Sequence, residues 1–314
     1  MTARDDESVD VSVVIVSYHC REKLLCCLRS LSAPSTLRSE VIVVDNGSDD
    51  GSVEALSEHW PGVLVLPLGF NAGFSRANNV GIARARGRRV LILNPDTVVS
   101  EKALEHLALW LDEHPEAGVA APRLLNPDGS DQQTARSFPT PLAALFGRRS
   151  PMTRWFPRNR FSQRFLSGRD HRGSLPFRVD WVSGAAMMVA ADAIAKVGAF
   201  DEDYFLFWED ADWCRRLADA GYEVWTVPEA VITHHEGSTR SRRFSPRMVC
   251  HFHRGAYLYW RKHHAPQPWN PARWMGAAAL SGRAIAVMAN EQRRAVNRRV
   301  HAARGATPQV SNAA

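Results

Sequence analysis

Short, strongly apolar runs recur along the first part of the chain, and segments with helical spacing separate them. The runs occupy residues 11–16, 41–44, 63–66, 90–93 and 119–121, and the helical segments occupy residues 21–31, 52–59, 75–86 and 101–113. Runs this short and apolar are typical of strands buried on both faces of a parallel sheet. Because parallel neighbours need a crossover between them, the alternation predicts an α/β fold with a doubly wound, mostly parallel sheet.

The alternation stops near residue 128, where arginines and aromatic residues begin to interleave, and a regular pattern returns near residue 179. That later pattern predicts a strand at 179–183, a helix at 210–220 and a strand at 222–227. From residue 240 to the end, Glu291 is the only acid. We therefore expect a main domain at residues 1–265, an insertion or lid at about 128–178, and a basic helical extension at 266–314.

The charge balance indicates an anionic partner. The net charge is +6 and the isoelectric point about 9.3, which suits nucleotide phosphates, a lipid surface or nucleic acid, or else an arginine-rich surface that only keeps the chain solvated. The five cysteines show no CxxC spacing, which favours reduced thiols. No signal-like apolar segment opens the chain, and no run of about 18 apolar residues follows, so we expect a cytoplasmic protein without a membrane-spanning helix.

Polar residues follow the first, second and fourth predicted strands. In an open parallel sheet, ligands bind at the carboxyl ends of the strands. The first strand runs into Ser17 and Tyr18 without a GxGxxG loop, and no GxxxxGK[ST] motif occurs, which weighs against dehydrogenases, P-loop kinases and ATPases. Asp45 ends the second strand, where it suits either a ribose or base contact or an Asx turn before the next helix.

The fourth strand ends in Asn94, Pro95 and Asp96. A carboxylate at this position suits Mg²⁺ or Mn²⁺ that bridges diphosphate oxygens. The alternative is that Asp96 or Ser100 caps the helix that follows.

Two later segments carry further candidates. Glu209, Asp210 and Asp212 open a helix after an aromatic run, and a carboxylate at the rim of an apolar segment suits a general base. Asp212 is also spaced for an ion pair with Arg216. His234 and His235 end a strand, and because adjacent side chains of an extended chain point to opposite faces, at most one can reach a site as a metal ligand.

Seven sequence segments, taken in order, carry a family resemblance. They are VSVVIVSYHC, VIVVDNGSDDGS, NAGFSRANNVGIARARG, LILNPDTVV, WVSGAAMMV, FWEDADWCRRLADAGYEV and ITHHEGST. In this order they resemble the family 2 glycosyltransferases with the GT-A fold, and within them the bacterial rhamnosyltransferase-like branch. The resemblance runs from residue 11 to about residue 239.

The resemblance implies a role for each matching position. Asp210 becomes the catalytic base, and Asp96 and His234 become ligands of a divalent metal, Mn²⁺ or Mg²⁺. The implied donor contacts are Ser17, Tyr18, Asp45, Asn71, Asn78, Asn94 and Asp96. The implied acceptor contacts are Gly184, Ala185, Trp208 and Glu209. One departure is that Asn94 stands where the family's DxD motif has its first acid, which lowers the charge offered to the metal.

The activity implied is inverting transfer of a sugar from a nucleotide-diphosphate donor to a hydroxyl of a glycan or polyprenyl-diphosphate-linked glycan. The resemblance favours L-rhamnose from dTDP-rhamnose in cell-envelope polysaccharide synthesis, and the alternative is galactofuranosyl or other hexosyl transfer from a UDP-sugar. Arg216 or an arginine of residues 148–178 then adds to stabilisation of the leaving group. The basic extension, with Trp269, Trp274 and Met275, predicts a peripheral position on the anionic cytoplasmic face of the plasma membrane.

Three other classes compete with this hypothesis. A nucleotidyltransferase would usually carry a glycine-rich basic loop after the first strand, and none is present. A nucleic-acid-binding protein rests on charge alone, because no binding motif is evident. A non-catalytic sugar-nucleotide-binding protein would not need Asp96 and Asp210. The sequence leaves the oligomeric state open.

Overall fold

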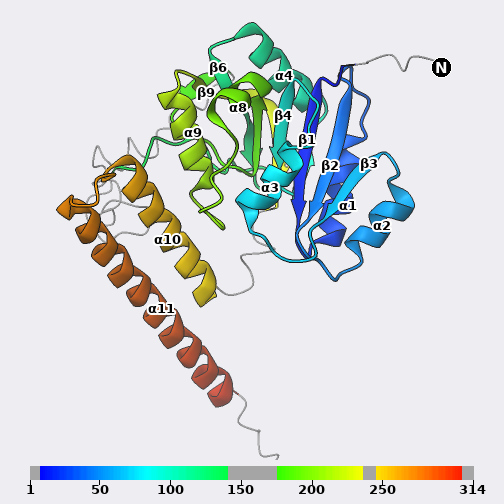
Figure 1. The fold of residues 1–314 in the computed structure, drawn as a ribbon. Helices are drawn as coiled ribbons and strands as arrows, with labels where there is room; N and C mark the ends of the chain where they lie inside the picture. Colours follow the sequence, from blue (N-terminus) through cyan, green and yellow to red (C-terminus); the bar gives the residue numbers. More distant parts are fainter. Residues whose placement is uncertain (1–7, 141–174, 236–244, 306–314) are drawn as a thin grey trace, which may run out of the picture. The chain divides into compact units, whose positions relative to one another are not determined.

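The computed structural model describes residues 8–140, 175–235 and 245–305. The chain divides into two compact units, Met1–Glu236 and Gly237–Ala314. In the first unit, the described residues form a nine-stranded sheet in the order β3-β2-β1-β4-β8-β6-β9-β5, with β7 paired to β9 (Figure 1). The strands are β1 (Val11–Ser17), β2 (Ser39–Asp45), β3 (Val63–Pro67), β4 (Arg89–Leu93), β5 (Thr97–Val99), β6 (Ala117–Leu125), β7 (Phe177–Val179), β8 (Ala186–Ala190) and β9 (Glu223–His234).

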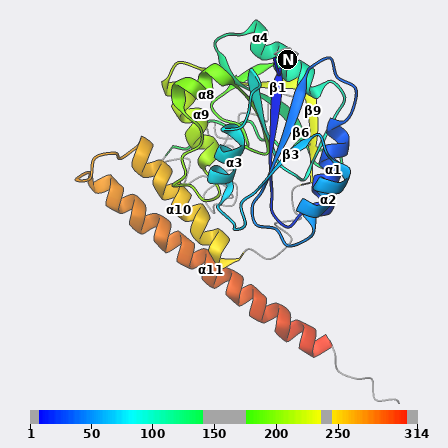
Figure 2. The same ribbon diagram turned by 45° about the vertical axis from the view of Figure 1, so that its right-hand side comes forward.

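Helices cover both faces of this sheet, as the doubly wound prediction requires. They are α1 (Arg21–Leu31), α2 (Ser52–His59), α3 (Phe74–Ile82), α4 (Ala103–Glu113), α8 (Ala191–Val197) and α9 (Glu209–Asp219). In Figure 2 the sheet lies between α1 and α2 on one side and α3 on the other. The side chains alternate accordingly: Val13 and Ile15 pack with α1 and α4, whereas Val16 packs with Ala77 of α3.

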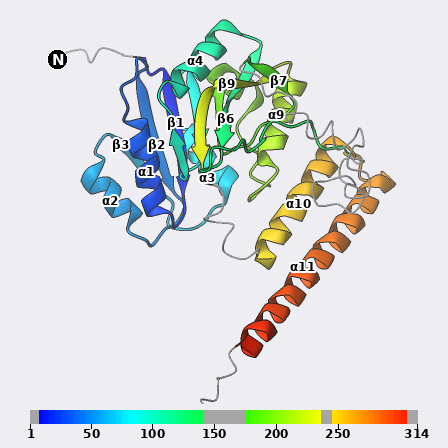
Figure 3. The ribbon, with the colours of Figure 1, turned by 180° about the vertical axis from the view of Figure 1, so that it is seen from behind.

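The sheet combines a parallel half with a mixed half. Strands β3, β2, β1 and β4 run parallel to one another, and β8 then pairs antiparallel with β4. Beyond β8, β6 and β9 pair parallel and lie side by side when the sheet is seen from behind (Figure 3). The predicted α/β class and the predicted strands of the parallel half are therefore confirmed.

The strand predicted at residues 179–183 is wrong. β7 ends at Val179, and the next strand, β8, begins only at Ala186. Val182 between them is 1% exposed, so its apolar character reflects burial outside the ladder. The intervening backbone makes other contacts, because Trp181 bridges to Arg136 and the Gly184 N–H binds Asp210.

The second unit contains α10 (Pro246–His263) and α11 (Pro271–Gly305), which lie side by side (Figures 1 and 3). The Trp260 indole N–H donates to the Ala272 carbonyl at 3.0 Å. Gly276 permits this approach, because a Cβ there would meet the Trp260 ring at 2.5 Å. Among the described residues, neither of these helices nor any other combines the length and apolarity needed to span a bilayer.

Candidate active site

The carboxyl ends of β1 and β2 meet at one edge of the sheet. Ser17 and Asp45 are register partners, and both are almost completely buried. The Asn46 N–H donates to the Ser17 carbonyl at 2.8 Å, which continues the ladder one residue further. Tyr18 leaves this edge with 46% of its surface exposed and its ring against His19.

Asp45 has one committed oxygen and one uncommitted oxygen. Its Oδ2 accepts hydrogen bonds from the N–H groups of Gly47 at 3.2 Å and Ser48 at 3.0 Å. The predicted Asx turn therefore forms, but it uses only one of the two carboxylate oxygens. Its Oδ1 is buried and has no hydrogen-bond partner among the described residues. A buried acceptor left unpaired is unfavourable by about 1–3 kcal/mol, which a donor N–H or O–H from a ribose or base would relieve.

Asn46 is a contributor that sequence reasoning missed. It is 4% exposed, and its side chain holds the loop after β3. Its Oδ1 accepts the Ala72 N–H at 2.7 Å, and its Nδ2 donates to Asn71 Oδ1 at 3.1 Å. Asn46 follows Asp45 directly in an Asx-rich turn, so only its side-chain hydrogen bonds to residues 71–73 distinguish it from an ordinary turn residue. It places Asn71 beside the ends of the first two strands.

Asn78 lies inside α3 rather than in a loop. It is 1% exposed, and its Nδ2 donates to the Phe74 carbonyl at 2.9 Å. Its amide nitrogen is therefore committed to the helix. Its Oδ1 is buried without a hydrogen-bond partner in the described part of the chain.

The end of β4 brings Asn94 and Asp96 to His234. His234 Nε2 lies 3.2 Å from Asp96 Oδ1 and 3.5 Å from Asn94 Nδ2. Their meeting depends on β5, which follows Asp96 directly and pairs Thr97 with His234 across the antiparallel ladder. His234 is 8% exposed, whereas His235 is exposed and its carbonyl accepts from the Lys23 ammonium group.

The helix-cap alternative for Asp96 and Ser100 is wrong. The N-cap of α4 is Lys102 in the left-handed region, and no side chain caps this helix. Residues 97–99 form β5 between Asp96 and the helix. The Asp96 carboxylate is therefore placed by a strand rather than by a helix terminus.

Asp96 and His234 fit a divalent cation. Two ligands of one octahedral ion at about 2.1 Å lie about 3 Å apart, close to the 3.2 Å between Oδ1 and Nε2. The described residues contain no cluster of three or more histidine, cysteine or acidic side chains that could hold a metal. The pair offers one carboxylate oxygen and one imidazole nitrogen, so a cation held there would keep coordination positions open for other ligands.

Asp210 stands in the first turn of α9, behind two strained residues. Phe207 and Trp208 both have left-handed backbones, with φ of 72° and 78°. Such conformations are unfavourable for bulky side chains, and they occur most often at functional sites. They turn the chain so that Asp210 Oδ2 accepts the Gly184 N–H at 3.2 Å.

Residues 184–185 link Asp210 to the loop that follows β4. The Ala185 carbonyl accepts the Asn94 N–H at 2.8 Å, while the preceding amide binds Asp210. A Cβ at Gly184 would lie 3.5 Å from the Asp210 Cβ. One short segment before β8 thus ties the end of β4 to the start of α9.

Glu209 and Asp210 form a coupled pair of carboxyl groups. Burial raises the pKa of both, and for Glu209 the neighbouring Asp210 charge raises the pKa further. N–H groups of Gly184 and Ala211 and the charge of Arg136 lower the pKa of Asp210 against this effect. Glu209 Oε2 is buried without a hydrogen-bond partner in the described ranges. These effects raise the pKa of Glu209 more than that of Asp210, which makes Asp210 the candidate for a base.

Asp212 and Arg216 serve the fold. The predicted ion pair forms at 2.8 Å, with Asp212 fully buried. Arg216 also donates to the carbonyls of Val197 and Ala199. These bonds give the Arg216 guanidinium a structural role, and its role at the leaving group stays a prediction. Apart from Arg178, which pairs with Glu223, the arginines predicted at residues 148–178 lie outside the described residues.

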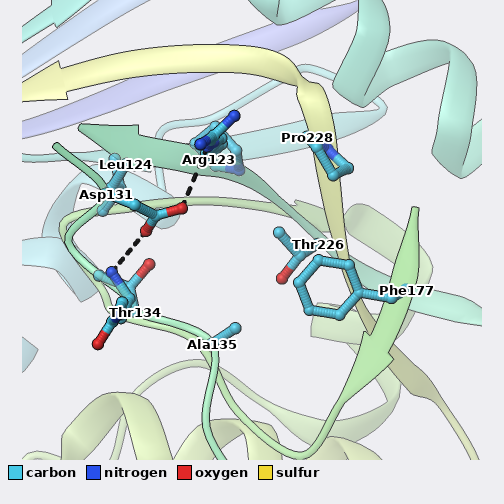
Figure 4. Close-up of a pocket in the computed structure, with 10 residues that line it drawn as sticks. Arg123, Leu124, Asp131, Thr134, Ala135, Phe177, Thr226 and Pro228 are labelled. Atoms are coloured by element: carbon cyan, nitrogen blue, oxygen red, sulfur yellow. Dashed lines mark hydrogen bonds and ion pairs between the residues drawn. The ribbon is translucent and has the colours of Figure 1, made fainter. Parts of the chain in front are cut away.

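A hollow between β6, β7 and β9 contains none of the predicted site residues. Arg123, Asp131, Phe177 and Thr226 are among the residues that line it, and Figure 4 shows the Asp131–Arg123 ion pair on one side of it. The groups described above meet instead at the strand ends. We therefore place the active site there rather than in this hollow.

Comparison with known proteins decides the family. The family model described as glycosyl transferase family 2 matches residues 12–183, more than half of the chain. The chain is a family 2 glycosyltransferase. The matched span includes Asp45, Asn94 and Asp96.

The relatives of this glycosyltransferase include rhamnosyltransferases. It is 29% identical over 304 residues to N-acetylglucosaminyl-diphospho-decaprenol L-rhamnosyltransferase of Mycobacterium tuberculosis, covering 93% of this chain and 97% of that protein. It is 23% identical to dTDP-rhamnosyl transferase RfbF of Shigella flexneri, covering 82% of each. Rhamnosyltransferase WbbL of Escherichia coli is 24% identical, over 72% of this chain and 83% of that protein. The glycosyltransferase thus falls in the rhamnosyltransferase-like branch.

Solved structures support the GT-A fold. A structure of GalNAc-T7 with UDP, GalNAc and Mn²⁺ superposes with a TM-score of 0.58 at 15% identity, covering 85% of this chain and 53% of that one. Staphylococcus aureus TarS superposes at 0.50, covering 77% of this glycosyltransferase and 39% of that chain. The glycosyltransferase therefore spans about half or less of either structure, and the likeness concerns the fold.

The raised pKa of Glu209 predicts a pH-dependent loss of stability. Above its ordinary pKa of 4.5, the unfolded chain releases this proton while the folded chain retains it. Stability then falls as the pH rises, by up to about 1.4 kcal/mol per pH unit until the folded pKa is reached. Glu209→Gln removes the effect, so its melting temperature should gain on that of the wild type as the pH rises above the ordinary pKa of 4.5. Thermal unfolding followed by circular dichroism measures this.

Glu54→Gln, at an exposed position of α2, is the control and should show a pH-independent difference from the wild type. If the difference between Glu209→Gln and the wild type is constant over the same range, Glu209 does not hold a proton in the folded protein.

Proposed function

We propose that this family 2 glycosyltransferase is an inverting rhamnosyltransferase of polysaccharide synthesis. It moves L-rhamnose from dTDP-rhamnose to a hydroxyl of a lipid-linked glycan. The observation that supports this most strongly is the match along nearly the whole length of the N-acetylglucosaminyl-diphospho-decaprenol L-rhamnosyltransferase. RfbF and WbbL, whose names also specify rhamnosyl transfer, support the same donor sugar.

The chemistry assigned to the chain is a single displacement. Asp210 takes the proton of the acceptor hydroxyl as its oxygen attacks the anomeric carbon, and the bond from that carbon to the diphosphate oxygen breaks. The configuration inverts because attack and departure occur on opposite faces of the sugar. No second carboxylate is needed as a nucleophile, since no sugar–enzyme bond forms. The Gly184 N–H keeps the base oriented.

The other strand ends hold the donor. Asp45 Oδ1 is positioned as an acceptor for the nucleoside, with Asn71 held alongside by Asn46. Asp96 and His234 would hold a divalent cation, which when bound neutralises charge that develops on the departing diphosphate. Asn94 contributes an amide beside them without adding charge.

Asp210→Asn should fold normally and lose transfer. The amide is nearly isosteric but cannot take the proton, and loss of a general base lowers the rate by about 10²–10⁴-fold. Release of dTDP from dTDP-rhamnose in the presence of a polyprenyl-diphosphate N-acetylglucosamine acceptor and Mn²⁺ measures turnover. Asp219→Asn, on the same helix but exposed and paired with Arg215, is the matched control and should keep wild-type turnover. Near-normal turnover of Asp210→Asn would remove Asp210 from the base role.

Asp96→Ala should uncouple nucleotide binding from metal. Wild-type protein should bind dTDP at least tenfold more tightly with Mn²⁺ than without it, because the cation joins the diphosphate to Asp96 and His234. The variant should lose most of that gain in titration calorimetry. Asp49→Ala, which alters an exposed carboxylate paired with His19, is the control. An equal gain from Mn²⁺ in Asp96→Ala and the wild type would contradict the metal site.

The second unit supplies a membrane-facing surface for a lipid-linked acceptor. On α11, Trp274, Met275 and Ile285 are 66%, 71% and 65% exposed. Helical spacing places Trp274, Ala278, Gly282 and Ile285 on one face, and Arg273 and Arg283 lie on the same helix. An apolar stripe with nearby arginines is typical of helices that lie in the interface of an anionic bilayer.

The double variant Trp274→Gln/Ile285→Gln should lose about tenfold or more of its affinity for vesicles of equal parts phosphatidylglycerol and phosphatidylcholine. Co-sedimentation of the full chain at low salt measures this, and binding should fall at high salt. Leu109→Gln, which removes a 55% exposed leucine from α4, should bind like the wild type. Wild-type protein that stays in the supernatant with these vesicles at low salt would contradict the membrane surface.

A further inference from the structure

Gln132 contacts the edge of the His234 ring that is turned away from Asp96. Its Oε1 lies 2.9 Å from His234 Nδ1, and its Nε2 donates to the His234 carbonyl at 2.7 Å. The same Nε2 donates to Asn126 Oδ1 at 3.0 Å. Gln132 thus clamps both the ring and the backbone of the histidine. It lies outside the seven segments that carry the family resemblance, and nothing in its sequence context marks it.

The hydrogen bonds behind Gln132 have a fixed direction, set by Asp128. The Ser130 hydroxyl lowers the pKa of Asp128, and as a carboxylate Asp128 can only accept. The Ser130 hydroxyl therefore spends its single proton on Asp128 Oδ1, at 2.6 Å. Its oxygen is left to accept from Asn126 Nδ2, at 2.8 Å. This bond fixes which end of the Asn126 amide is nitrogen.

The direction then passes to the histidine. Because the Asn126 amide nitrogen donates to Ser130, the Asn126 amide oxygen faces Gln132. Gln132 Nε2 therefore donates one N–H to Asn126 Oδ1 and the other to the His234 carbonyl. Gln132 Oε1 is left as the acceptor that faces the ring. In the neutral imidazole, the proton consequently sits on Nδ1. Nε2 then carries a lone pair directed at the point that Asp96 Oδ1 also faces.

The backbone of residues 126–132 forms a hairpin that keeps the side chains of Asp128, Ser130, Asn126 and Gln132 within hydrogen-bonding distance of one another. It follows β6, where the Asn126 N–H donates to the Ser130 carbonyl at 2.7 Å and the Gly129 N–H donates to the Asn126 carbonyl at 2.9 Å. Gly129 has φ of 79°, a left-handed conformation that a glycine adopts without strain. The turn therefore returns the chain so that residues 126, 130 and 132 share one network.

We propose that Gln132 is a positioning residue for the metal site, and that the relay Asp128–Ser130–Asn126–Gln132 holds His234 as its Nδ1–H tautomer. The inference rests on the proposed function in that it takes His234 as the ligand of a donor-bound cation. The relay supplies what a ligand requires, a lone pair on Nε2 and a fixed ring plane. Partners of this kind typically contribute 10–100-fold to metal affinity.

The tautomer itself is the first measurement. Imidazole ¹⁵N NMR of the metal-free full chain at about pH 8, with His234→Gln used to assign the signals, reports which nitrogen bears the proton. We expect protonated Nδ1 and unprotonated Nε2 in the wild type. Gln132→Met should lose this preference, and Ser130→Ala should give a mixture because it frees the Asn126 amide to turn over. A wild-type ring protonated on Nε2 would overturn the proposal.

Metal affinity is the second measurement. Mn²⁺ titrated into the wild type with dTDP should bind 10–100-fold more tightly than into Gln132→Met. Asp131→Ala disturbs the same hairpin through Arg123 and Gln133 without touching the relay, and should bind Mn²⁺ like the wild type (Figure 4). Equal Mn²⁺ affinity in Gln132→Met and the wild type would overturn the role of Gln132, as would an equal loss in Asp131→Ala.

The two proposals fail separately in these experiments. The tautomer is read without metal or substrate, so it stands or falls whatever the transfer activity proves to be. Asp210→Asn with undiminished turnover would overturn the assigned mechanism and leave the tautomer unchanged.

Discussion

The parallel ladder of β1 with β2 and β4 is the constraint on which the site depends. Its register ends β1 and β2 together at Ser17 and Asp45, and β4 ends nearby at Leu93, just before Asn94 and Asp96. Backbone hydrogen bonds fix these positions, so the polar groups are held by a buried core rather than by flexible loops. The favourable packing of the core thereby offsets the unfavourable free energy of burying Asp45.

The antiparallel strand β8 links this part of the sheet to Asp210, the proposed base. Because it pairs with β4, the segment before it reaches both the Asn94 N–H and the Asp210 carboxylate. The left-handed backbone conformations of Phe207 and Trp208 set the direction in which the chain enters the helix that carries Asp210. A displacement of β8 would therefore disturb Asp210 and the loop that follows β4 together.

Charge is distributed by environment rather than by residue type. Asp210 accepts two N–H bonds, and the charge of Arg136 lowers its pKa, whereas burial raises the pKa of the adjacent Glu209, one oxygen of which has no hydrogen-bond partner among the described residues. At the end of β4, Asp96 faces an imidazole whose opposite ring nitrogen contacts Gln132. The surroundings of each group, and not its residue type alone, thus affect how readily it binds a proton.

The sequence by itself determined the α/β class, the strands of the parallel half and the family, because short apolar runs and ordered motifs are local properties. It placed Asp45, Asp96 and Asp210 at element ends for the same reason. It wrongly extended a strand over residues 179–183, since burial of Val182 looks alike inside and outside a ladder. Only the tertiary structure paired β5 with β9, which brings His234 to Asp96, and only it revealed Asn46 and Gln132, because their roles consist of partners 25 and 102 residues away.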